Sequence, residues 1–226
     1  RIAIITEVFV AVLLYLFLVN AFNFIDGIDG LAGVFVLLVT SVCGWWLLKV
    51  GDDFYASLAI VLSGSILGFL PFNWGRAKVY LGDSGILVSA LIICLLCSRM
   101  IQINSLLGGD HPFKVSHPYL LILGLVFFPT FDAIRVIGNR IVRKKSPIKG
   151  DKSHLHYEFL FRLQSPPKVV LLIVTMSIAT FGFFVLAQDR WSEFYLIFLA
   201  AVFWLFIILW VSWRLPLRKK MQSEIN

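Results

Sequence analysis

Long apolar segments are the feature that most limits how this chain can fold. A helix needs about 20 mostly apolar residues to cross a bilayer, within a range of about 17–25. Segments of this kind recur along the whole sequence and are separated by short polar connections. Because backbone polar groups in lipid must pair within their own segment, we predict an all-α fold, a polytopic bundle of about seven transmembrane helices. The predicted spans are residues 2–22, 31–49, 54–72, 84–103, 118–138, 168–187 and 192–213.

The composition supports this fold and excludes a soluble domain. Of the 226 residues, 59% are hydrophobic and 15% are charged, and the mean hydropathy is +0.89. Soluble domains have about 45–50% apolar and about 25% charged residues. The three cysteines all fall within apolar segments, which favours small helix residues over metal or redox ligands. We therefore predict that residues 1–226 form one integral membrane domain in a lipid bilayer, with no nucleic-acid partner.

The distribution of positive charge predicts the orientation of the chain. With seven spans, the 20–30 turn, the 73–83 connection, the 139–167 segment and the C-terminal tail lie on one side. Fifteen of the 20 Lys and Arg residues belong to that side. Since basic residues concentrate on the cytoplasmic side of membrane proteins, we predict that this side and the C-terminus are cytoplasmic. The polar clusters that could carry chemistry all fall on this same side.

The stretch NAFNFIDGIDGLAG, residues 20–33, places four polar residues between two apolar segments. Asp26 and Asp29 are three residues apart, so a helical turn would bring both carboxylates to one face. Asn20 and Asn23 repeat this spacing one turn earlier. Polar side chains near membrane depth are costly and usually line a cavity or pair with a partner. Helix capping is the alternative explanation, but four such residues in register favour a polar site.

A second polar segment, KVYLGDSGILVSALI, places Asp83 at the start of a predicted span. This aspartate could be an ordinary helix N-cap, or part of a helix start that binds phosphate. Asn73, Arg76 and Lys78 precede it and suit an anionic ligand. Taken alone, the segment indicates little.

A third segment runs from FPTFDAIRV to DKSHLHYEFL. Asp132 and Arg135 are three residues apart, so they can pair on one helix face. The basic residues that follow are typical of an anchor on anionic lipid. His154 could donate to a phosphate, act as a base or bind a metal, and His156 lies two residues on. Phosphate contact is favoured over metal binding, because the other two histidines fall on the opposite side.

The same membrane face therefore offers carboxylates and amides, many cations and two histidines. Oxygen ligands of this kind suit a hard divalent cation such as Mg²⁺, and the cations and histidines suit phosphate groups. Because the site lies at a membrane face, we expect one of the phosphates to belong to a lipid.

The three motifs together resemble the polyprenyl-phosphate N-acetylhexosamine-1-phosphate transferases, which form glycosyltransferase family 4. The residues that carry the resemblance are NAFNFIDGIDGLAG, VYLGDSG and SPIKGDKSHLHYEFL, in the family's order and over nearly the whole chain. The third segment is similar to the WecA/TagO-like branch, which uses UDP-N-acetylglucosamine. The MraY-type branch, which uses UDP-MurNAc-pentapeptide, carries a different His-rich segment.

The resemblance implies a reaction in the bacterial plasma membrane. GlcNAc-1-phosphate would pass from a UDP-N-acetylhexosamine to undecaprenyl phosphate with release of UMP, as the first membrane step of envelope polysaccharide synthesis. Mg²⁺ would be the cofactor, with Mn²⁺ as an alternative, and a homodimer is a candidate assembly. The 139–167 loop would bind substrate. The implied metal ligands are Asn23 and Asp83. The implied catalytic residues are Asp26, Asp29, Asp83 and His154, and the implied substrate-binding residues are Asn20, Asn73, Lys78, Asp132, Arg135 and His156.

The sequence also departs from the family pattern. An Asp-Asp motif that the family carries upstream has no equivalent before Asn20, and Ile86 and Tyr157 stand where Ser and His are usual. We therefore expect the chain to be the C-terminal part of an enzyme with 10–11 helices, and its activity alone is left open. The alternatives are an MraY-type transferase, a CDP-alcohol phosphotransferase, an inactive fragment or a membrane transporter with buried carboxylates.

Overall fold

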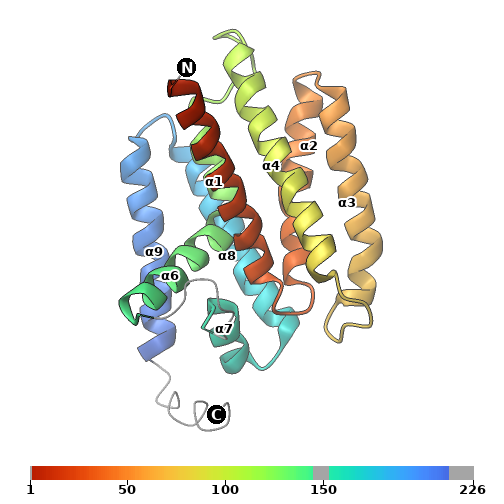
Figure 1. Cartoon of the computed structure of the whole chain (residues 1–226), viewed down its shortest axis with the longest axis vertical. Coiled ribbons are helices and arrows are strands. Elements are labelled where there is room, and N and C mark those ends of the chain that lie inside the picture. The colour runs from red at the N-terminus through yellow and green to blue at the C-terminus, as the bar shows by residue number, and fades with distance from the viewer. Residues whose placement is uncertain (1, 145–152, 214–226) are drawn as a thin grey trace.

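A computed structural model describes residues 2–144 and 153–213 of the chain. Within these ranges the chain forms nine α-helices and no β-strand (Figure 1), which confirms the predicted all-α fold. The helices are α1 (Ile2–Ile25), α2 (Leu31–Lys49), α3 (Asp53–Asn73), α4 (Gly82–Leu106), α5 (Pro118–Leu125), α6 (Phe127–Val142), α7 (Leu155–Leu163), α8 (Pro166–Ala187) and α9 (Glu193–Trp213).

Most of the predicted spans correspond to one long helix each. Among the described residues, α2, α3, α4, α8 and α9 are long and apolar enough to cross a membrane. The apolar part of α1, Phe9–Ile25, is slightly shorter, although the whole helix has 24 residues. α3 runs through Pro71 to Asn73 without a break, as membrane helices tolerate proline better than soluble ones.

The predicted span at 118–138 is broken in the structure. α5 ends at Leu125 and α6 begins at Phe127, with a bend of 74° between them. Pro129, in the first turn of α6, has no N–H to donate to the carbonyl of Leu125, and proline is well tolerated in a first turn, so it favours the start of a new helix here. If the bent pair is taken as one span, the described helices supply up to six spans by length and composition, against the seven predicted. α6 lies obliquely across the bundle (Figure 1), and it carries Asp132 and Arg135.

The two ends of the bundle differ in the segments that they gather. One end holds the turn between α1 and α2, the connection between α3 and α4, and α7 (Figure 1). The other end holds the connections α2–α3, α4–α5 and α8–α9. This arrangement confirms the predicted alternation, although the assignment of the first end to the cytoplasm stays a prediction. Residues 145–152 and 214–226, which include many of the predicted cytoplasmic basic residues, lie outside the described ranges.

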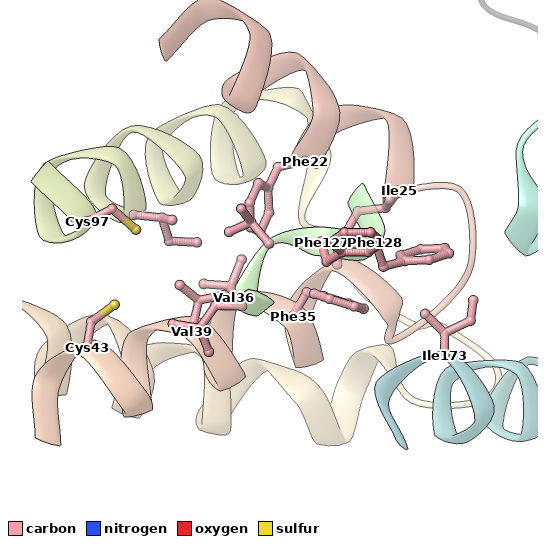
Figure 2. Close-up of a cluster of buried hydrophobic side chains, with 14 of the residues drawn as sticks. Phe22, Ile25, Phe35, Val36, Val39, Cys43, Cys97, Phe127, Phe128 and Ile173 are labelled. Atoms are coloured by element: carbon pink, nitrogen blue, oxygen red, sulfur yellow. The ribbon is translucent and has the colours of Figure 1, made fainter. Parts of the chain in front are cut away.

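The core is built from aromatic and aliphatic side chains that several helices share. Phe35 of α2 stacks on Phe128 of α6 at a centroid distance of 5.7 Å, and Trp204 of α9 lies 5.4 Å from Phe128 (Figure 2 shows both phenylalanines). Cys43, Cys94 and Cys97 are buried and unpaired, as predicted for small residues of apolar helices. Large apolar side chains on the outer faces of α3 and α9 remain exposed, which suits contact with lipid. The core therefore fixes α6 against α2 and α9. It thereby also fixes the position of Asp132 and Arg135, which α6 carries.

Candidate active site

The turn after α1 and the loop before α4 are bound to each other by two side chains. Asn73, at the end of α3, accepts a hydrogen bond from the Gly30 amide at 2.8 Å and donates to the carbonyl of Val79 at 2.9 Å. Asp29 accepts from the Ala77 amide at 3.0 Å. Gly30 has φ +84°, a left-handed conformation that favours glycine. Asp29 and Asn73 thus frame the site, and neither acts as a helix cap.

This frame yields a stability prediction for Asn73. Replacing Asn73 by Ala would leave the buried Gly30 amide and the Val79 carbonyl without their partner, which is expected to cost about 2 kcal/mol. We expect a lower thermal unfolding midpoint for Asn73→Ala in detergent. Asn139→Ala, which changes an exposed asparagine, is the matched control and should have the same thermal unfolding midpoint as the wild type. Equal midpoints for all three proteins would contradict the framing role.

Three carboxylates lie close enough on this end to influence one another. Asp26 is exposed, yet the residues around it remove part of its hydration, and this partial desolvation raises its pKa. The negative charges of Asp83 and Asp29 raise the Asp26 pKa further. Asp83 lies in the first turn of α4, which begins at Gly82 with Leu81 as its N-cap, so Asp83 does not cap this helix. Its exposed carboxylate makes no hydrogen bond to any described residue.

The remaining predicted residues of the first two motifs lie at the edge of this group. Asn23 is half-buried in the last turn of α1, and its side chain has no hydrogen bond within the described ranges. Asn20 is exposed and donates to the carbonyl of Leu16 in its own helix at 2.6 Å. Lys78 is exposed on the loop before α4. Asn23 therefore keeps its amide oxygen for a ligand, whereas Asn20 is not brought into the polar group by any described contact.

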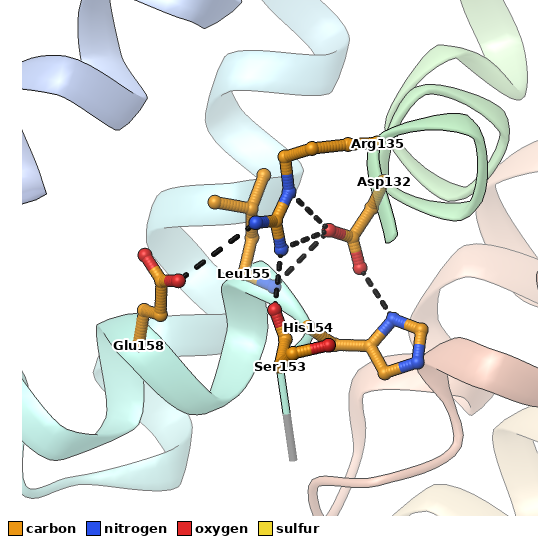
Figure 3. A network of polar contacts seen from close by, with 6 residues as sticks. All are labelled: Asp132, Arg135, Ser153, His154, Leu155 and Glu158. Carbon is orange, nitrogen blue, oxygen red and sulfur yellow. Dashed lines mark hydrogen bonds and ion pairs between the residues drawn. The ribbon is translucent and has the colours of Figure 1, made fainter. Parts of the chain in front are cut away.

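Asp132 of α6 is the centre of a buried network that holds the start of α7 (Figure 3). Its side chain is 1% exposed, and its Oδ2 accepts a hydrogen bond from Nδ1 of His154 at 2.8 Å. Its Oδ1 accepts from Nε and Nη2 of Arg135 at 3.1 and 2.8 Å, which confirms the predicted pair, and from the Leu155 amide at 3.1 Å. With both oxygens occupied in this way, Asp132 orients His154, and the substrate contact expected of Asp132 stays a prediction.

Arg135 extends the network to both sides of the α7 start. Its Nη2 donates to the carbonyl of Ser153 at 2.6 Å, and its Nη1 lies 3.8 Å from the carboxylate of Glu158. Glu158 and Ser153 were not predicted as site residues. Neither contact leaves a local signal in the sequence, because both join Arg135 of α6 to residues far along the chain. Arg135 therefore anchors α7, and the substrate contact expected of it stays a prediction.

The two histidines of the third motif have different surroundings. His154 packs 5.2 Å from Phe24, and its Nε2 points away from Asp132 without a hydrogen bond to a described residue (Figure 3). His156 is fully buried, and neither of its ring nitrogens has a hydrogen-bond partner among the residues that the structure describes. Burial lowers the pKa of His156 to about 3, so its imidazole is neutral at physiological pH. His154 is thus the histidine with a nitrogen available to a ligand.

Gly27 marks the place where α7 docks on the turn after α1. A Cβ added there would lie 2.5 Å from Nε2 of His156 and 2.5 Å from the hydroxyl of Tyr157. The two rings pack on each other at a centroid distance of 4.3 Å. Such a close approach is possible only for a residue without a side chain. Gly27 and Tyr157 were not predicted as site residues, although Gly27 lies between Asp26 and Asp29 in the sequence.

The donor set bears on the predicted Mg²⁺. Among the residues that the structure describes, no group of three or more His, Cys, Asp or Glu side chains is arranged to hold a metal ion. Mg²⁺ usually binds through one or two carboxylates and completes its shell with water and substrate phosphates. No described residue forms a hydrogen bond with the side-chain oxygens of Asp83 and Asn23, and the negative field that raises the Asp26 pKa is one that a cation would relieve. These residues fit Mg²⁺ bound together with a phosphate ligand.

Comparison with known proteins agrees with this architecture. The sequence profile of glycosyl transferase family 4 matches residues 1–101. The decaprenyl-phosphate N-acetylglucosaminephosphotransferase of Mycobacterium leprae is 37% identical over 177 residues, which are 73% of this chain and 44% of that protein. The probable undecaprenyl-phosphate N-acetylglucosaminyl 1-phosphate transferase of Bacillus subtilis is 32% identical over 189 residues, 81% of this chain and 49% of the relative. No solved structure gives a significant match.

The fold and the site define a polytopic helical membrane protein with a carboxylate, amide and histidine site at one end of its bundle. The identities above cover most of this chain, and they agree with the profile match. The chain belongs to glycosyl transferase family 4. It spans about half the length of the relatives that it matches.

Proposed function

We propose that the protein transfers GlcNAc-1-phosphate from UDP-N-acetylglucosamine to a polyprenyl phosphate, with release of UMP. In this reaction an oxygen of the lipid phosphate forms a bond to the β-phosphorus of the donor, and the bond from that phosphorus to UMP breaks. The observation that carries the proposal is the meeting of three motifs at one end of a membrane bundle, with Asp26 beside Asp83 and with His154 held on Asp132. The names of these relatives describe the same chemistry.

The roles of the residues follow from their surroundings. Asp83 and Asn23 would hold Mg²⁺, which when bound neutralises phosphate charge and orients the transferred group. Asp26 would accept hydrogen bonds from polar groups of the donor, while Asp29 and Asn73 keep the turn in position. The Asp132 carboxylate accepts the Nδ1 proton of His154, so that Nε2 faces the ligand. In its protonated form this imidazole would donate from Nε2 to a phosphate oxygen.

We further propose that this end of the bundle faces the cytoplasm of a bacterial cell, at the plasma membrane. The basic residues of the sequence concentrate on the connections of this end, and UDP-sugars are cytoplasmic metabolites. A membrane transporter would not require its polar motifs and basic residues to gather at one end of the bundle. Mg²⁺ as cofactor, undecaprenyl phosphate as acceptor and a homodimer as assembly are parts of the same proposal.

The proposal is tested with the full-length protein in membranes supplied with polyprenyl phosphate, Mg²⁺ and radiolabelled sugar nucleotides. We expect a lipid-linked labelled sugar from UDP-GlcNAc and none from UDP-MurNAc-pentapeptide. Product from the pentapeptide nucleotide alone would contradict the branch and favour the MraY-type reaction. No lipid-linked product from either donor would contradict the transferase itself.

The metal site gives a separate prediction for Asp83. The Asp83→Asn variant keeps the shape of the side chain but loses its charge, so we expect the Mg²⁺ concentration for half-maximal activity to rise about tenfold or more. Asp53→Asn is the matched control, because Asp53 is an exposed first-turn aspartate of α3 at the opposite end. An unchanged Mg²⁺ dependence in Asp83→Asn would remove this residue from the metal site.

A further inference from the structure

The start of α7 presents three aromatic side chains to the turn after α1, and they differ in what they can offer a ligand. His154 uses Nδ1 on Asp132, and His156 is fully buried against Gly27. Tyr157 is half-buried, and its hydroxyl makes no hydrogen bond to any residue that the structure describes. Tyr157 is therefore the residue of this turn that combines a rigidly packed ring with an unused polar atom.

The position of the Tyr157 hydroxyl is fixed by packing on two sides. Its ring lies 4.3 Å from the ring of His156, with an angle of 49° between the planes. The hydroxyl would lie 2.5 Å from a Cβ at Gly27, so it sits directly over this glycine. Asp26 directly precedes this glycine in the chain, and it is exposed. The phenol and the carboxylate thus lie side by side at the rim of the site.

The charges around this pair restrict what it can bind. Burial raises the pKa of Tyr157, and the negative charge of Asp26 raises it further, so the phenol keeps its proton and can donate. The Asp26 carboxylate can only accept. An unprotonated phosphate oxygen also only accepts, so the Asp26 carboxylate cannot form a direct hydrogen bond with it. The matching ligand is an uncharged group that offers an N–H to the carboxylate and a C=O to the phenol.

We propose that Tyr157 and Asp26 together bind an amide-type group of the sugar-nucleotide donor, and that Tyr157 is a specificity-determining residue of the site. This inference rests on the proposed transferase function. A UDP-N-acetylhexosamine carries such an N–H and C=O pair twice, in the acetamido group of the sugar and in the uracil ring. The Tyr157 hydroxyl donates to the carbonyl, and Asp26 accepts from the N–H.

The test compares the full-length wild type with Tyr157→Phe, which removes the hydroxyl and keeps the ring against His156 and Gly27. Equilibrium binding is measured for UDP-GlcNAc, for UDP-glucose, which lacks the acetamido group, and for UMP, which lacks the sugar. We expect Tyr157→Phe to weaken UDP-GlcNAc binding about tenfold, the usual effect of one lost hydrogen bond. Tyr119→Phe, which changes a tyrosine that is 64% exposed at the start of α5, is the matched control and should bind all three as the wild type does.

The outcomes distinguish the acetamido group from the uracil ring as the ligand of this pair. They also distinguish a failure of the role of Tyr157 from a failure of the proposed transferase function. A loss for UDP-GlcNAc, with UMP and UDP-glucose unchanged, supports binding of the acetamido group. A loss shared by all three nucleotides at an unchanged thermal unfolding midpoint supports binding of uracil. Unchanged affinity for all three, or a loss that accompanies a lowered midpoint, would overturn the role of Tyr157 alone. A wild type that binds none of the nucleotides would overturn the proposed function as well.

Discussion

The Asp132→Asn variant of the full-length protein is expected to lose about 100-fold in the rate of lipid-linked sugar formation. Both oxygens of Asp132 accept hydrogen bonds, from His154 on one side and from Arg135 and the Leu155 amide on the other. The Asn side chain offers one accepting oxygen and one donating NH₂ group. Its NH₂ group would therefore face another donor, either the Arg135 guanidinium or the Nδ1–H of His154. His154 would then leave its tautomer or its orientation, and Nε2 would no longer face the ligand.

The rate is measured at saturating UDP-GlcNAc, together with the affinity for UMP. Because Asp132 acts through His154, the rate should fall far more than the affinity for UMP. Asp110→Asn, which alters an exposed aspartate in the loop between α4 and α5, is the matched control. The amount of folded protein and its unfolding midpoint are determined for each variant, because Asp132 also anchors α7. A rate within about twofold of the wild type would contradict the positioning role.

The positions of the helices could be predicted well from the sequence, because one physical signal decides them. The hydropathy of residues 31–49 predicts α2 to the residue, and the other long helices differ from their predicted ranges by a few residues at their ends. The break at Val126 was missed, because residues 118–131 carry no charged side chain and Pro129 alone gives the local signal. The bend also depends on packing, since Phe128 is held between Phe35 and Trp204.

The sequence also predicted that the three motifs meet at one end of the bundle, but not how their residues contact one another there. The spacing of Asp132 and Arg135 predicted their pair, because neighbours on one helix face are fixed by helical geometry. The bond from His154 to Asp132 joins residues 22 positions apart and depends on how α7 returns to α6. For the same reason the sequence did not distinguish Asp29, which frames the turn, from Asp83, which keeps its carboxylate for a ligand.

The Gly27→Ala variant is expected to lose activity by about 100-fold or more, although it adds only one methyl group. Gly27 does not have a left-handed φ, so its backbone would accept alanine. The obstacle is spatial, because the new Cβ would lie 2.5 Å from both His156 Nε2 and the Tyr157 hydroxyl. His156 is packed on all sides, so the first turn of α7 would have to move and would carry His154 with it. A positioned catalytic group that shifts by about 1 Å can cost about 100-fold in rate.

Gly64→Ala is the matched control for this variant. Gly64 also has an ordinary helical φ, lies in α3, and would meet nothing within 4 Å on gaining a Cβ, so its activity should equal that of the wild type. The double variant Gly27→Ala with Tyr157→Phe gives the sharper test. Removing the phenol oxygen leaves the clash with His156 in place, so we expect no recovery of activity. Full recovery would show that only the hydroxyl obstructs the methyl group, and that the buried histidine does not fix the docking of α7.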